Sequence, residues 1–476
     1  MTLLLAIVLA APSAPTPAPL TKADVRKKQA AARSVDEHAR ELVALSDEVW
    51  AFAETALGET RSAALLADYA EKQGFRVERG ISGMPTAFVA SYGSGRPVIA
   101  VLGEYDALPG LSQKAVAERA PLAEGAAGHG CGHNLFGAAS LGAAIAVKEL
   151  IAASRLQGTV RYYGTPAEEN VGGKAYMARD GVFADVDVVL AWHPADRSRA
   201  DMQGGQAIVD LMVEFKGTAA HAASDPWNGR SAADAAELFT HAVNLMREHV
   251  RPSVRMHYTI ISAGDVPNVV PERAAVWIWA RDADRKVLDG VLERLKQAVQ
   301  GAALAAGVSG SARVQAGDLE ILINETGARL LDANLRFVGP IAYTPEEDAF
   351  ARRLQAAAGV EVRGMETAIG SLEGQEPEGG STDVGDVSWV APTLHVSVAT
   401  APRGVPWHAW PVVAAAGMSI GHKGLVAAAK TLAATMVDLF EDPAARAAIR
   451  AEFERKTKGF VYRPYIPEGP PPLPKR

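Results

Sequence analysis

The sequence is poor in cysteine and has no surplus of basic residues. Cys131 is the one cysteine among 476 residues, so an intramolecular disulfide is impossible and the fold must rest on its apolar core. The net charge of −7 gives no reason to expect nucleic acid or an anionic membrane surface as a partner. The rest of the composition, 48% hydrophobic and 22% charged, predicts a globular chain of about two or three domains.

No segment of the chain has the unbroken apolar length of a membrane helix, and we therefore expect no membrane span. The run MTLLLAIVLAA is too short to cross a bilayer and is followed by a Pro/Ala-rich stretch. It is similar to the apolar part of a secretory signal, although the basic start is missing. We predict a signal-like segment over residues 1–20 and export to the periplasm or medium; a disordered tail on a cytoplasmic protein is the alternative. The Pro-rich end, residues 463–476, is predicted to form an extended tail.

Two parts of the chain, residues 34–204 and 324–462, carry the pattern of an α/β domain. Strand-like runs such as PVIAVLGEYDAL, TVRYYGT and VDVVLAWH alternate with helical stretches such as the small-residue segment 134–153. This alternation predicts a doubly wound, mainly parallel sheet. In such sheets the ligand site lies at the carboxyl ends of the strands.

The rhythm changes between residues 205 and 323. A strand pattern in AIVDLMVEFKG is followed by an amphipathic helix with a Ser cap, by two further strands, by a long helix and by a last strand in SARVQAGDLEI. The order β-α-β-β-α-β predicts a self-contained α+β domain with an antiparallel sheet. We interpret it as an insertion into the catalytic domain.

Polar clusters follow four of the apolar runs. Cys131 and His133 stand on either side of one glycine, so both side chains can face one cation. Glu168 and Glu169 are adjacent, which is costly unless a cation compensates them or one of them is protonated. Each cluster alone is a weak signal, and together they offer a ligand set for two ions of the Zn or Mn type. The candidate metal ligands are Cys131, His133, one of the two glutamates, His193 and His408.

The paired glutamates suggest a division of labour. One carboxylate anchors a metal, and the other can stay unligated and act as general base on a water molecule. Two other classes of function stay open. One is a cysteine nucleophile formed by Cys131 and His133, and the other is a non-catalytic protein that binds a metal or a ligand.

Eight motifs carry a resemblance to a known family. GEYDALPGL, GHGCGHN, GTPAEENVGGK, AWHP, GTAAHAA, PNVVP, GSTDVGDVSW and SIGHKG resemble, in family order from about residue 100 to 425, the amidohydrolase branch of the dimetal aminoacylase/carboxypeptidase family. The resemblance implies that the metal ligands are Cys131, His133, Glu169, His193 and His408. It also implies that Glu168 is the general base and that Asp106 orients a ligand histidine.

The resemblance further implies an assembly and a reaction. The inserted domain matches the family's lid, which also joins two subunits. There His221 is similar to a residue that reaches a neighbouring subunit's site and stabilises an oxyanion, and Asn268 to one near the substrate. The implied reaction is hydrolysis of an N-aroyl or N-acyl amino acid, p-aminobenzoyl-glutamate in the first place, by a metal-bound hydroxide. A dipeptidase or an N-acyl-amino-acid deacylase is the runner-up, and whether a second polypeptide is needed is left open.

Some positions have more than one interpretation. Asn134 stands where the auxin-conjugate relatives carry aspartate, which places the chain with the aminobenzoyl-glutamate group. His408 and His422 lie fourteen residues apart, and we choose His408 as the ligand and His422 as a second-layer residue. Asp383 and Asp386 either reach the site or cap a helix.

Overall fold

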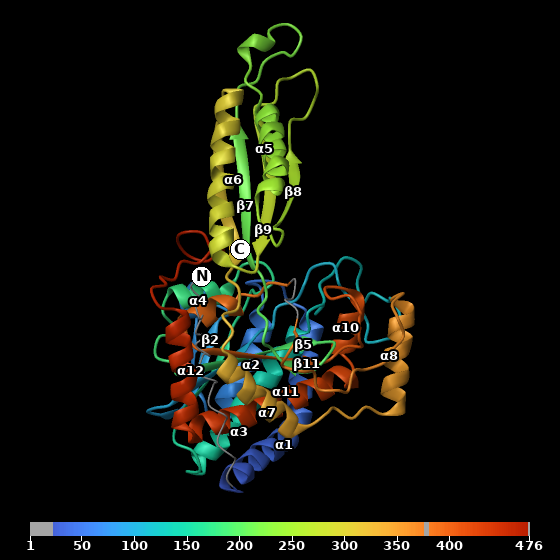
Figure 1. The fold of residues 1–476 in the computed structure, drawn as a ribbon. Coiled ribbons are helices and arrows are strands. Elements are labelled where there is room, and N and C mark those ends of the chain that lie inside the picture. Colours follow the sequence, from blue (N-terminus) through green and yellow to red (C-terminus); the bar gives the residue numbers. More distant parts are fainter. Residues whose placement is uncertain (1–21, 376–379, 475–476) are drawn as a thin grey trace, which may run out of the picture.

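The protein is described here by a computed structural model that covers residues 22–375 and 380–474, with two sheets in this part of the chain (Figure 1). The predicted signal-like segment, residues 1–20, lies outside the described residues. Figure 1 shows the larger sheet in the lower body and the smaller one in an upright lid above it. The α/β class with an inserted α+β domain is therefore confirmed.

The larger sheet has seven strands, and its four central strands are parallel. Its order is β1-β2-β4-β3-β5-β11-β6, with antiparallel pairs only toward the edges. The central strands β4, β3, β5 and β11 pair in parallel, so their carboxyl ends share one edge. The strands are β1 (Arg76–Arg79), β2 (Phe88–Ser94), β3 (Val98–Gly103), β4 (Gly158–Gly164), β5 (Val188–Ala195), β6 (Arg199–Ala200) and β11 (Thr393–Ala399).

Helices cover this sheet, and close approach between them depends on small residues. Helix α3 packs against the sheet and against α1 and α11. A Cβ added at Gly142 of α3 would lie 2.4 Å from Leu42 Cδ1 of α1, which explains the small-residue pattern of this segment. The body helices are α1 (Lys22–Phe52), α2 (Thr60–Lys72), η1 (Ile81–Gly83), α3 (His133–Ala152), α4 (Gly173–Arg179), α7 (Glu325–Val338), α8 (Pro345–Ala357), α9 (Val384–Val390), α10 (Trp410–Ala416), α11 (Ser419–Glu441) and α12 (Pro443–Lys456).

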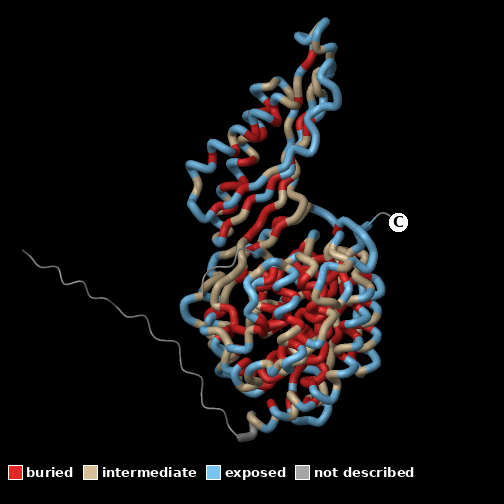
Figure 2. The backbone as a smooth tube through the Cα atoms, turned by 90° about the vertical axis from the view of Figure 1, so that its right-hand side faces the viewer, coloured by how far each residue is buried: buried red, intermediate tan, exposed pale blue. Residues whose placement is uncertain are grey.

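Helix α3 is long and apolar enough to cross a bilayer, in contrast to the expectation that no segment has this property. Its most apolar stretch is 78% buried inside the protein. Figure 2 shows the buried residues concentrated in the same body, with a thinner buried layer in the lid. The composition of α3 is therefore that of a core helix beneath a sheet.

The lid is a four-stranded antiparallel sheet in the order β10-β7-β9-β8, with two helices. The chain order β7-α5-β8-β9-α6-β10 confirms the predicted β-α-β-β-α-β unit. Alternate side chains of β7 and β9 are buried with α5 and α6 in a separate apolar core. The lid elements are β7 (Ala207–Lys216), η2 (Pro226–Asn228), α5 (Ala232–Met246), η3 (Arg247–His249), β8 (Arg255–Ser262), β9 (Arg273–Asp282), α6 (Arg285–Ala306) and β10 (Ser309–Asp318).

The Pro-rich tail forms no helix or strand over its described residues, 463–474. It is not detached, because Tyr465 is buried against the lid core and its hydroxyl donates to Asp289 of α6. Tyr462, just before the tail, donates its hydroxyl to Asp386 at 2.6 Å in the body. The end of the chain therefore connects the lid to the body.

Candidate metal centre

The residues predicted as metal ligands meet at the carboxyl-end edge of the parallel strands. His133 is the first residue of α3, Cys131 lies two residues before it, and His193 lies in the last part of β5. Glu169 follows β4, and His408 lies in the loop between β11 and α10. Segments far apart in the chain thus converge because β3, β4, β5 and β11 run in the same direction.

Two groups of potential ligands share the Cys131 thiol. One consists of Cys131, His133 and His193, and the other of Cys131, Glu169 and His408. Within each group the donor atoms lie within 4.8 Å of one another. Cys131 Sγ is 3.4 Å from His193 Nε2, and His408 Nε2 is 3.5 Å from Glu169 Oε2. Two atoms bound to one ion at about 2.0–2.3 Å are separated by about 3.0–3.6 Å, so both spacings suit a metal.

A third group contains a residue that the motif analysis did not single out. Glu104, His133 and Glu168 also bring three donor atoms together. Glu104 follows β3 directly and is fully buried. The sequence did contain a signal, because Glu104 and Asp106 stand two positions apart after a buried strand, in the same relation as Cys131 and His133.

The histidines are held so that their Nε2 atoms face the cluster. Asp106 Oδ1 lies 2.9 Å from His133 Nδ1, and its Oδ2 accepts from the Glu169 amide at 2.9 Å. His193 Nδ1 lies 2.7 Å from the carbonyl oxygen of Pro194. A partner on Nδ1 fixes the tautomer that leaves Nε2 available as a ligand. Asp106 therefore occupies the place of the predicted orienting carboxylate.

Three residues of the site motifs have backbone conformations with positive φ. Gly132, between the first two ligands, has a φ of 80° and packs so closely that an added Cβ would lie 2.9 Å from Pro194 Cβ. Ala167, before the glutamate pair, has a φ of 63°, and its amide donates to Glu59 Oε1 at 2.9 Å. His408 has a φ of 53°, and its amide donates to the Gly130 carbonyl at 3.1 Å. The surrounding contacts hold these unusual conformations.

Lys174 forms a buried ionic cluster beneath the site. Its ammonium is 2.7 Å from Glu104 Oε1 and 2.6 Å from Asp383 Oδ1, and all three side chains are fully buried. Asp383 also accepts from the Lys174 amide at 2.8 Å, so it supports this cluster and makes no side-chain cap on α9. Asp386 instead accepts from the Leu319 amide at 3.1 Å and from the Tyr462 hydroxyl.

The site contains several buried acidic groups whose negative charge a cation would stabilise. Burial, Glu169 and Glu104 raise the pKa of Glu168, and burial raises the pKa of Glu169 to about 7. Burial and Glu169 also raise the pKa of the Cys131 thiol. Burial opposes protonation of His133, but the charges of Cys131 and Glu104 raise its pKa well above the usual value. Carboxylates and a thiol so close together become stable as anions when positive charge is placed among them.

The residues present fit divalent ions. His133 Nε2 and Glu169 Oε1 are buried and form no hydrogen bond with any described residue. Such atoms are costly in a protein interior unless a ligand occupies them. The donor set of thiolate, imidazole and carboxylate is the one that Zn²⁺ and related ions prefer.

Some predicted site residues lie elsewhere. His221 and Asn268 are exposed in the lid, where His221 and Val269 form an isolated bridge and Asn268 accepts from the Ala222 amide at 3.0 Å. His422 Nε2 is 2.9 Å from Asp47 Oδ1 of α1. Within residues 22–375 and 380–474, none of these three belongs to a ligand group.

Asn134 is a structural residue in its contacts. It is buried, and its amide nitrogen donates to Ser46 Oγ at 3.0 Å and to the Ala416 carbonyl at 3.2 Å. An ionised aspartate could not donate these bonds. The asparagine therefore fits the packing of α1, α3 and α10 and touches none of the ligand groups among the described residues.

Comparison with known proteins identifies the family. The sequence profile described as peptidase family M20/M25/M40 matches residues 100–394, more than half of the chain. The chain belongs to this family. It is 38% identical over 460 residues to a subunit of the p-aminobenzoyl-glutamate hydrolase of Escherichia coli, covering 90% of this chain and 95% of that protein. It is 30% identical over 464 residues to Xaa-Arg dipeptidase of Mus musculus, covering 94% and 97%.

A solved structure shares the fold. A dinuclear metal-binding peptidase of the M20 family from Bacillus subtilis aligns with a TM-score of 0.58 at 18% identity, covering 85% of this chain and 99% of that one. Family membership and the ligand groups together make this M20 protein a metal-dependent amidohydrolase, as the motifs predicted.

Proposed function

We propose that this M20 enzyme hydrolyses the amide bond between an aroyl or acyl group and an amino acid, with p-aminobenzoyl-glutamate as the leading substrate and Mn²⁺ or Zn²⁺ as the ions. One observation carries the reaction type: Cys131 joins two ligand groups directly beside the Glu168–Glu169 pair. The relative from Escherichia coli, which aligns over nearly its whole length, supports the substrate.

An arginine near the site favours an anionic substrate group. Arg281, in β9, lies close enough that its charge, after burial and His133, contributes to lowering the pKa of His408. A guanidinium is suited to bind a carboxylate of glutamate. A relative named Xaa-Arg dipeptidase aligns with 94% of the chain, so dipeptides are the alternative substrates. Glutamate amides are therefore the leading substrates, and dipeptides are second.

The side chains divide the work of amide hydrolysis. When bound, two divalent ions polarise the amide carbonyl and lower the pKa of a water molecule. Glu168 takes the proton of the attacking water and returns it to the leaving amine. Asp106 keeps His133 in the ligand orientation. The positive charge of Arg281, which acts on His408, would attract the substrate carboxylate toward the site.

A substrate panel tests this proposal. Protein reconstituted with Mn²⁺ or Zn²⁺ is assayed with p-aminobenzoyl-glutamate, with the matched p-aminobenzoyl-arginine and with alanyl-arginine. We expect kcat/KM for the glutamate amide to exceed that for its arginine counterpart by about 10–10²-fold, the worth of one charged contact. Chelation should abolish all turnover. Undiminished activity in chelator, or a preference for the arginine amides, would contradict the proposal.

The distance between His221 and the metal groups supports a homodimer. The connections 217–231 and 263–272 form the far tip of the lid, away from the body (Figure 1). Strand β7 has ten residues between the body and that tip, a span of about 33 Å. His221 therefore lies too far away to reach the metal groups of its own chain. A second copy, joined through the lid, would bring this histidine to the site.

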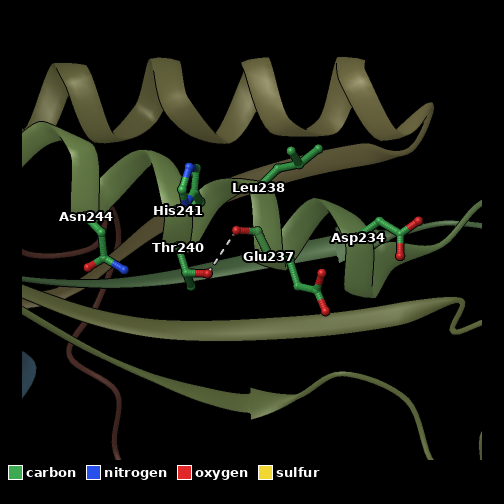
Figure 3. Close-up of a pocket in the computed structure, with 6 residues that line it drawn as sticks. All are labelled: Asp234, Glu237, Leu238, Thr240, His241 and Asn244. Atoms are coloured by element: carbon green, nitrogen blue, oxygen red, sulfur yellow. Dashed lines mark hydrogen bonds between the residues drawn. The ribbon is translucent and has the colours of Figure 1, made fainter.

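The surface of the lid also supports association. Strand β8 is an edge strand, and Ile260 and Ile261 at its end are exposed. Leu238 and Leu245 are exposed on the outer face of α5. Figure 3 shows the shallow groove on this helix, whose lining side chains are Asp234, Glu237, Leu238, Thr240, His241 and Asn244. Mixed apolar and polar surface of this kind is typical of an interface between chains.

Complementation between inactive variants tests the shared site. His221→Ala and Glu168→Ala chains are each expected to be inactive, because the first lacks the partner's contribution and the second lacks the base. Co-expressed with different tags and purified as heterodimers, they should recover up to about half of the activity per site pair, since one hybrid site receives both residues. The Glu168→Ala homodimer prepared in the same way is the control.

Inactive heterodimers of proven composition would contradict catalysis across the lid. Sedimentation should give a dimer of identical chains. A requirement for a second, different polypeptide would instead agree with the naming of the Escherichia coli relative as one of two different subunits of its hydrolase.

A further inference from the structure

We propose that Glu104 is a further metal ligand, which joins Cys131, His133 and His193 at one of the two metal positions. The inference rests on the proposed dinuclear site and adds a ligand to the five that the sequence motifs suggested. Glu104 lies at the carboxyl end of β3, immediately after Gly103, and its side chain has no exposed surface.

The distance between two atoms is the first argument. Glu104 Oε2 is 3.0 Å from His133 Nε2. Two ligand atoms bound to the same ion at about 2.0–2.2 Å and at angles of 90–109° are about 3.0–3.5 Å apart. Both atoms are buried, and within the described part of the chain neither makes a hydrogen bond. The two atoms therefore have the spacing of two ligands on one ion, and neither has its hydrogen-bonding capacity met by the protein.

The tautomer of His133 is the second argument. Asp106 Oδ1 lies 2.9 Å from His133 Nδ1, which places the imidazole proton on that nitrogen in a neutral ring. Nε2 then faces a carboxylate oxygen at 3.0 Å. Without a metal, a second proton on the ring has to bridge these two atoms. A metal ion at this place takes the position of that proton and binds both atoms.

Lys174 explains why Glu104 can serve two partners. Its ammonium lies 2.7 Å from Oε1, so this oxygen is compensated, and Oε2 remains directed at His133. Asp383 holds the ammonium from the other side at 2.6 Å. The buried lysine thus fixes the orientation of the carboxylate, as residues that orient metal ligands commonly do.

An unequal pair of metal positions follows from this assignment. On this assignment the first position has four protein donors: the group Cys131, His133 and His193, and Glu104, which joins it through His133. The second has three, from Cys131, Glu169 and His408, and His408 is the ligand whose side chain is 54% exposed. Closed four-ligand sites hold zinc firmly, whereas three-ligand sites leave a position for water or substrate. We therefore expect one tightly bound ion and one that exchanges more readily.

Cobalt titration of Glu104→Gln, with Glu452→Gln as a matched control, tests the assignment. Glu452 is also a buried glutamate, but it accepts from the Glu325 and Thr326 amides of α7, and within the described residues it belongs to none of the ligand groups. Metal-free protein is titrated with Co²⁺ against a chromophoric chelator, and the absorption spectrum is recorded. Glu104→Gln should lower the affinity of the tighter position by at least about 10²-fold and change its d–d bands. Glu452→Gln should keep the wild-type affinity and spectrum.

The outcomes separate this inference from the proposed function. The thiolate-to-cobalt charge-transfer band of Cys131 reports the metal centre itself, and its absence from the wild-type protein would overturn both. If this band is present and Glu104→Gln retains wild-type affinity and d–d bands, Glu104 is only the ionic partner of Lys174. Should Glu104→Gln not fold, Glu104→Asp keeps the charge beside Lys174 and withdraws the carboxylate from His133. A wild-type spectrum in that variant would equally overturn the assignment.

Discussion

Replacement of Glu168 by glutamine should lower turnover by about 10²–10⁴-fold while the protein keeps both metals, because the variant loses only the proton acceptor. The amide is nearly isosteric with the carboxylate. Glu168 belongs to a group with Glu104 and His133 and is not among the residues that join Cys131. Steady-state rates and metal analysis by mass spectrometry on the same preparation measure both properties.

Glu169→Gln is the matched control for this prediction, because the two residues are adjacent and chemically identical. Glu169 Oε2 is 3.5 Å from His408 Nε2, and its side chain is 3% exposed. This variant should bind at least one ion more weakly, and excess metal should partly restore its activity. A Glu168→Gln enzyme with full metal and near-normal turnover would remove Glu168 from the role of base. Equal metal content and equal turnover in the two variants would indicate that the two glutamates do not have separate roles as base and metal ligand.

The fold could be predicted because the strands of the body are buried and continuous in their apolar character. VVLAWHPA and VIAVLG are almost wholly buried in β5 and β3, and such runs between helices are typical of a parallel sheet. The lid could be predicted from a change of period, since the residues of β9 alternate between buried and more exposed. In both cases the position of a residue within its own strand determines whether it is buried. The local sequence pattern was therefore sufficient to predict the strands.

The metal site was predictable where ligands cluster in sequence and less so where they do not. Cys131 and His133 are close in the chain, and the motif shows them at once. The choice of His408 over His422 rested on spacing, and the contact that places it, between the His408 amide and the Gly130 carbonyl, joins segments far apart in sequence. The bond of His422 to Asp47 is equally long-range. Such contacts form only when the chain is folded.

Glu104 and Lys174 form a contact that the sequence does not reveal. Both lie inside quoted motifs, yet nothing in the sequence says that the Lys174 ammonium meets Glu104 at 2.7 Å from a different element. Buried charges are rare in general, and a lysine after two glycines is more often on the surface. The charge balance of a site is a property of its three-dimensional arrangement, and this information appears only in the structure.

Replacement of Cys131 by alanine should remove both metals and abolish turnover, which is the largest effect expected of any single ligand. Cys131 is the residue that the group with His133 and His193 and the group with Glu169 and His408 have in common. His193 and His408 each belong to one of these groups. His193→Ala and His408→Ala should therefore each lower the affinity for one ion and leave the other ion bound. The loss of affinity in Cys131→Ala should exceed the roughly 10–100-fold loss that follows removal of a residue that merely orients a ligand.

The single cysteine also gives a direct measurement of this arrangement. In the metal-loaded enzyme the Cys131 thiolate is bound, so a thiol reagent should react slowly, and chelation should expose it to reaction. A nucleophilic cysteine gives the opposite pattern, with activity that survives chelation and is lost on alkylation while the metal stays bound. That mechanism needs a lowered thiol pKa, whereas burial and Glu169 raise the pKa of Cys131. Retention of two ions and full turnover by Cys131→Ala would rule out the shared ligand, because no other cysteine is present to replace it.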